Sequence, residues 1–162
     1  MDSAKQQKIL IAWLKDAHAM EKSLEQTMKA FAKAAEAFPD LQTKLEEHIE
    51  TTKDQAERIE TRLTAMGEDT STMKNVTGEI MGALQGYGAT FAKDEVIKNA
   101  LKAFASEYYE IASYNAIAAA ATELGDTETV DLADSIIEEE QEMADWAEEN
   151  LPDLVEQFLE GE

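Results

Sequence analysis

The stretch PDLQTKLEEHIETTKDQAERIETRLTAMG, residues 39–67, decides the fold. Its apolar residues recur every three or four positions, which is the period of one face of an α-helix. They are Leu41, Leu45, Ile49, Ala56, Ile59 and Leu63. Pro39 and Gly67 bound the pattern, and Asp40 is a residue type that caps helix starts. The stretch therefore predicts one long helix with a single apolar face.

The same rhythm continues toward both ends of the chain. It predicts a helix over residues 4–37, opened by a capping box at Ser3 and Gln6. A third helix is expected from a cap at Asp94 to Gly125, and a fourth follows it. The apolar face predicted for the third helix consists of Ile97, Leu101, Phe104, Tyr108, Ile111, Asn115 and Ala118.

Two segments depart from this regular pattern. Between residues 67 and 93 the rhythm weakens and glycines interrupt it, so we expect a crossover that carries one short helix at about residues 73–84. Pro152 is expected to begin a short amphipathic C-terminal helix. Two tightly turned helix pairs joined by one long connection predict a single domain over residues 1–162, an all-α four-helix bundle of ferritin-like type.

The amino-acid composition excludes several kinds of chemistry and limits the types of metal ligand. Hydrophobic residues make up 44% of the chain and charged residues 30%, with seven glycines and two prolines, as in a helical globular protein. The chain has no cysteine, so disulfides, thiolate metal sites and thiol catalysis are excluded. Any metal has to bind through oxygen or imidazole ligands.

The net charge of the chain limits the kinds of partner that it can bind. The formal net charge is −21, which argues against binding nucleic acid or an anionic membrane and favours cations or a basic protein as partners. The first apolar run, residues 9–14, is too short for a signal peptide or a membrane span. We therefore expect a cytoplasmic protein.

A few polar residues fall on the apolar faces. Stepping around each helix places Glu21 and Glu140 near the centres of their faces, and it places Glu107, His48 and Gln55 at the borders. A buried ionised carboxylate is costly unless it is paired or binds a metal, so these groups are candidate ligands for one cation. The alternative is that the glutamates reach solvent or bond to Tyr108, Tyr109 or Tyr114. Four acidic residues lie farther from the faces, and we expect them at the surface, behind the ligands or along a water channel: Asp16, Glu50, Glu110 and Glu139.

Four segments resemble the YciF stress-protein family of ferritin-like bundles. They are DAHAMEKSL (16–24), HIETTKDQAERI (48–59), EYYEIASY (107–114) and EEE (138–140). The resemblance implies a dimeric, cytoplasmic, stress-associated bacterial protein related to di-iron carboxylate proteins. It places Glu21, His48, Gln55, Glu107 and Glu140 at family positions, whereas Thr51, Phe104, Tyr108 and Ala144 replace residues that are usually Glu, Gln, His and Asp.

Two hypotheses about function follow. The Glu-x-x-His motif of a full di-iron site does not occur in the sequence, which favours a non-catalytic protein or one with a reduced carboxylate metal site. The alternative is a metal-binding protein with redox or metal-buffering activity. Its cofactor would be iron, manganese or zinc, bound by Glu21, His48, Gln55, Glu107 and Glu140. Whether it is an enzyme stays open, and a homodimer is the expected assembly.

Overall fold

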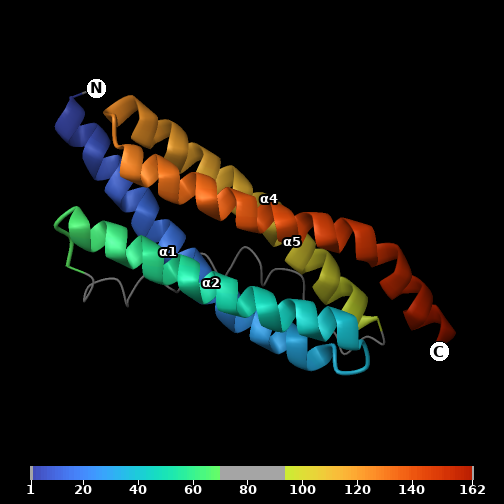
Figure 1. Cartoon of the computed structure of the whole chain (residues 1–162). Helices are drawn as coiled ribbons and strands as arrows, with labels where there is room; N and C mark the ends of the chain where they lie inside the picture. Colours follow the sequence, from blue (N-terminus) through green and yellow to red (C-terminus); the bar gives the residue numbers. More distant parts are fainter. Residues whose placement is uncertain (1, 70–93, 162) are drawn as a thin grey trace.

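Four helices make up the part of the chain that the computed structural model describes, residues 2–69 and 94–161 (Figure 1). They are α1 (Ser3–Ala34), α2 (Pro39–Ala65), α4 (Glu95–Leu124) and α5 (Thr127–Glu160). α1 and α2 form one antiparallel pair and α4 and α5 form the other, with α1 packed on α4 and α2 touching α5 more lightly.

The direction of the helices settles the topology. α2 and α4 are consecutive among the described helices, yet they run the same way along the bundle (Figure 1). A tight turn would have made them antiparallel, so a long connection is required, as in ferritin-like folds. This confirms the predicted all-α bundle. The short helix predicted at residues 73–84 lies outside the described residues.

The helix starts differ from the predictions in detail. The capping box predicted at Ser3 is wrong, because Asp2 is the cap and its side chain accepts a hydrogen bond from the Ala4 backbone N–H at 3.4 Å. The cap of α2 is Phe38 and not Asp40. Pro39 takes the first helical position, where its missing N–H costs nothing.

The helix ends are set by proline and glycine. α1 stops at Ala34 and not at Ala37, since the residue before a proline is pushed out of the helical region and the chain has to turn first. The predicted ends near Gly67 and Gly125 are confirmed. Both glycines have positive φ, 87° and 69°, which an L side chain adopts only with strain.

The separate C-terminal helix predicted from Pro152 is wrong. α5 runs unbroken through Pro152 to Glu160, and its last turns dock on the bundle through Leu154, which is 8% exposed. A proline inside a helix removes one backbone hydrogen bond and bends the helix without necessarily ending it. Burial of Leu154 and partial burial of Phe158 favour continuing the helix along the bundle.

The interior face of α4 is shifted by one position along the sequence from the predicted face. The buried residues are Val96, Asn99, Ala103, Ser106, Glu107, Glu110, Tyr114, Ile117 and Ala121. Two members of the predicted face, Leu101 and Tyr108, are exposed by 46% and 44%. A shift of one residue turns a helix by about 100°, so this helix presents Glu107 and Glu110 to the interior among smaller residues and carries large side chains such as Leu101 outside.

Candidate metal centre

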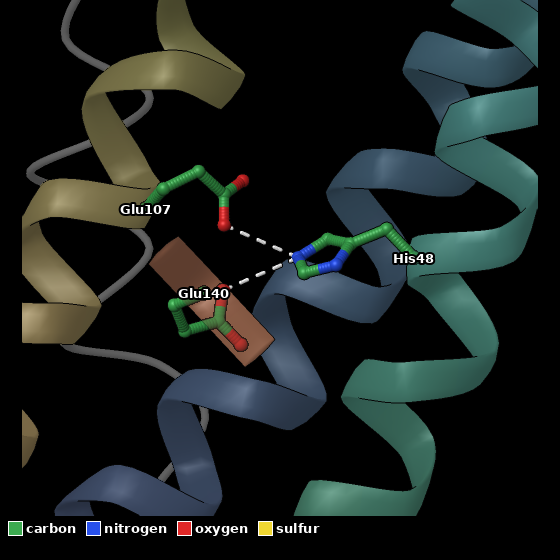
Figure 2. A group of neighbouring side chains, drawn as sticks. All are labelled: His48, Glu107 and Glu140. Carbon is green, nitrogen blue, oxygen red and sulfur yellow. Dashed lines mark ion pairs between the residues drawn. The ribbon is translucent and has the colours of Figure 1, made fainter. Parts of the chain in front are cut away.

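Three helices bring one ligand-capable side chain each to the same buried point. His48 comes from α2, Glu107 from α4 and Glu140 from α5, and all three are buried (Figure 2). One ligand atom from each lies within 4.8 Å of the others. His48 Nε2 lies 3.2 Å from Glu107 Oε2 and 3.3 Å from Glu140 Oε2. We call these three residues the His48 cluster.

Helical spacing produces this convergence. On α2, His48, Thr52 and Gln55 recur at four and three residues and all point inward. The Thr52 hydroxyl donates a hydrogen bond to the His48 backbone carbonyl at 3.0 Å, so this buried hydroxyl has a partner within its own helix. On α5, Glu140 lies one turn from the buried Ile136 and Met143, which hold it in the interior.

Two more carboxylates adjoin the cluster. Glu21 of α1 and Glu110 of α4 are both fully buried, close enough that the charges of Glu140 and Glu107 act on them. The Tyr114 hydroxyl donates a hydrogen bond to Glu21 Oε1. The tyrosine alternative considered for the buried glutamates is thus realised for one oxygen of Glu21.

A series of polar contacts extends from Glu140 through Gln55 and Glu139 to Arg58. The amide nitrogen of Gln55 donates to Glu140 Oε1 and also to Glu139 Oε2, the latter at 3.0 Å. Glu139 is in turn paired with Arg58. Gln55 therefore meets the cluster through its donor nitrogen, which orients Glu140 and does not add an oxygen ligand in this arrangement.

Burial dominates the protonation of three carboxyl groups. Burial, followed by the charge of Glu140, raises the pKa of Glu21 to about 8. Burial also raises the pKa of Glu107 to about 8, although its contact with His48 acts in the opposite direction. Burial and the neighbouring carboxylates raise the pKa of Glu110 well above its ordinary value. Burial thus favours the protonated form of all three groups.

His48 and Glu140 behave as an ion pair. Burial favours a neutral imidazole, but the contacts with Glu107 and Glu140 outweigh it and raise the pKa of His48 to about 10. Burial likewise opposes ionisation of Glu140, yet its contacts with His48 and Glu107 outweigh burial and lower its pKa. Without a cation, a proton on His48 occupies the centre of the cluster.

The oxygens of these carboxyl groups are poorly satisfied. Among the described residues, Glu107 Oε2 and Glu140 Oε2 face only His48 Nε2, and no hydrogen bond or ion pair reaches Glu21 Oε2, Glu107 Oε1 or either oxygen of Glu110. Buried polar atoms are normally hydrogen-bonded, because an unsatisfied one costs about 1–3 kcal/mol. Oxygen and imidazole donors are also the ligands that iron and manganese take. The residues present therefore fit a divalent cation.

The residues predicted from sequence can now be placed. Glu21, His48, Gln55, Glu107 and Glu140 are all buried. The cluster itself contains three of them, Glu21 lies beside it, and Gln55 supports it. Glu110 is fully buried beside Glu21, so the surface position expected as one alternative for it is wrong. Its spacing of three residues from Glu107 was the available signal, because it puts both on one helix face.

The remaining polar residues and the four positions that differ from the family pattern vary in their exposure. Asp16 and Glu50 are exposed as expected. Of the four positions that differ from the family, Ala144 is fully buried, whereas Tyr108 is 44% exposed and Thr51 and Phe104 are half-buried. Only Ala144 therefore removes a carboxylate from the bundle interior.

Comparison with known proteins agrees with this architecture. The family model described as a domain of unknown function (DUF892) matches residues 5–160. A crystal structure of a protein from Xanthomonas campestris pv. campestris is 32% identical, with a TM-score of 0.80 over 96% of this chain and 97% of that one. The Escherichia coli stress protein YciF is 24% identical, with a TM-score of 0.74 over 97% and 98% of the two chains. Among the described residues, no helix is long and apolar enough to cross a membrane.

Proposed function

From the premise that this chain belongs to the DUF892 family of YciF-type proteins, we propose that it is a stress-associated, metal-binding ferritin-like protein. A divalent cation would be held by His48 Nε2 and by carboxylate oxygens of Glu107 and Glu140. Glu21 and Glu110 would supply further oxygens on the side of α1 and α4.

One observation carries the proposal. Four buried glutamates and one buried histidine from four helices surround a single interior region, and four of their oxygens make no hydrogen bond or ion pair among the described residues. In the described part of the chain no Lys or Arg is buried, so no permanent positive charge balances the carboxylates in the bundle interior. A divalent cation would supply the missing charge and would satisfy the unpaired oxygens together.

A cation has to compete with protons for the same atoms. In the metal-free protein the protons on Glu21, Glu107, Glu110 and His48 reduce the cost of burial. Protons leave most of the carboxyl oxygens without partners, whereas coordination uses them. Binding should therefore release protons and strengthen as the pH rises.

The donor set favours iron or manganese over zinc. Structural zinc prefers four ligands with sulfur or nitrogen, whereas a set of several carboxylates and one imidazole suits metals that accept six ligands. Iron or manganese bound here would supply Lewis-acid or one-electron redox chemistry. The protein's own part is to hold the ligands rigidly, with Gln55 fixing Glu140.

A non-catalytic bundle is the second candidate. It is favoured by Ala144, which is fully buried where the family usually has Asp, and by the absence of a Glu-x-x-His motif. In that case the buried carboxyl groups would stay protonated, and added metal would leave the stability unchanged.

Thermal unfolding separates the two candidates. We expect saturating iron or manganese to stabilise the wild type by about 2–4 kcal/mol relative to protein with chelator. Glu107→Gln removes a ligand while keeping the size, so it should abolish this gain. Glu123→Gln, an exposed position on the same helix, is the matched control and should keep it. Equal melting temperatures with chelator and with each metal would favour the non-catalytic bundle.

A further inference from the structure

A second feature of the interior lies one helical turn from the His48 cluster. It is a pocket between the start of α2, the first half of α4 and the second half of α5. Its wall includes Leu45, Ala103 and Met143. These residues lie three, four and three positions from His48, Glu107 and Glu140, so each helix of the cluster contributes a pocket residue about 5 Å along its axis.

The pocket has an apolar interior with aromatic rings. Leu41, Leu45 and Leu154 are buried in its wall, and Phe38, Phe104 and Trp146 line it from half-buried positions. The space open to the centre of a water molecule is about 80 Å³. A single water needs about 10–15 Å³ by this measure, so the pocket has space for a ligand of several non-hydrogen atoms.

The charge at the pocket has one sign. Asp40 and Asp153 line it and are exposed, which places their carboxylates at the opening. Among the residues that the structure describes, no Lys or Arg lines the pocket. The chain carries a net charge of −21, so an anionic ligand would be repelled during approach and at the opening. The two carboxylates at the opening would instead attract a cation.

The geometry points to a binding site for a small amine with an apolar or aromatic body. The body would lie between Leu45, Met143 and Trp146, and the ammonium group would stay at the opening near Asp40 and Asp153. Such a ligand would lie one turn from the His48 cluster. Binding itself needs no metal and does not depend on the proposed metal site, so the two proposals can fail separately.

Tryptophan emission gives a direct test. The chain has two tryptophans, of which Trp146 lines the pocket and Trp13 lies on α1. In a Trp13→Phe variant kept in chelator, phenethylamine should cause a saturable change in Trp146 emission. Phenylacetate, an anion of similar size, should cause none, and neutral phenethyl alcohol should bind more weakly than the amine. In the matched Trp146→Phe variant, the emission of Trp13 should not respond.

Substitutions at the wall and at the opening separate shape from charge. Ala100→Leu fills the pocket and should weaken phenethylamine binding about tenfold or more, whereas Ala118→Leu, on α4 outside the pocket, should not. Asp153→Asn should weaken amine binding about two- to fivefold at low salt, and the exposed Asp145→Asn should leave it unchanged. Failure of Trp146 to respond, equal binding of phenylacetate, or unchanged binding by Ala100→Leu would overturn the proposal.

Discussion

Tyr114 and Glu21 show how single residues shape this interior. The Tyr114 side chain is 1% exposed and its hydroxyl donates to Glu21 Oε1. Burial, reinforced by the charge of Glu21, raises the pKa of Tyr114 well above its ordinary value, so the hydroxyl keeps its proton and remains a donor. The tyrosine therefore fixes the position of one carboxyl group beside the candidate metal centre.

Removing that hydroxyl should be costly. Tyr114→Phe keeps the ring but leaves Glu21 Oε1 buried without its donor, which should lower the unfolding free energy by about 1–3 kcal/mol in chelator. Denaturant unfolding followed by circular dichroism measures this loss. Tyr109→Phe, at a tyrosine that is 60% exposed on the same helix, is the control and should change stability by less than about 0.5 kcal/mol. Equal losses in the two variants would contradict the assigned hydrogen bond.

Among the helices, α4 shows where prediction from the sequence succeeds and where it stops. Its existence and its end at Gly125 follow from periodicity and from the glycine. Its inward face does not, because apolar periodicity identifies the inward face by its large apolar residues. Here Leu101 and Tyr108 point outward while Glu107 and Glu110 point inward. A site rich in buried carboxyl groups reverses the hydrophobic signal that would locate it, so the predicted apolar face does not contain Glu110.

The C-terminal part of α5 offers a prediction for an element. Leu154→Ala should lower the unfolding free energy by about 2–3 kcal/mol, because it opens a cavity where α5 packs on the bundle. Leu159→Ala, in the next turns of the same helix, should have almost no effect because Leu159 is 66% exposed. Chemical denaturation of both variants is the measurement. A Leu154→Ala protein as stable as the wild type would mean that the end of α5 does not dock.

For the whole molecule, the buried carboxyl groups predict an unusual dependence of stability on pH. In chelator, Glu21 and Glu107 have a pKa of about 8, above their ordinary value of 4.5. The folded state therefore holds more protons than the unfolded state between these values, and stability should fall as the pH rises from about 5 to 8. His48, raised from 6.5 to about 10, acts in the same direction at higher pH.

The expected loss is at least about 2 kcal/mol over that interval. Below pH 4.5 the sign reverses for Glu140, whose lowered pKa means that its stabilising contribution disappears as it gains a proton. Denaturant titrations in chelator at several pH values test this. Glu107→Gln should flatten the curve, and Glu123→Gln should not. Stability that rises steadily from about pH 5 to 8 would show that these carboxyl groups ionise normally.

The assembly of the whole molecule stays a prediction. The homodimer implied by the family resemblance would give Trp13, Leu101 and Tyr109, which are exposed by 42%, 46% and 60%, a surface to pack against. Light scattering of the purified protein distinguishes one chain from two.

The most direct test of the metal centre is an anomalous difference map from crystals of manganese-loaded protein. The account predicts one strong peak bonded to His48 Nε2 and to oxygens of Glu107 and Glu140, with Glu21 or Glu110 nearby. The same crystals of Glu107→Gln protein should lack it. Peaks confined to surface carboxylates, or an interior without any peak at saturating manganese, would contradict the metal centre.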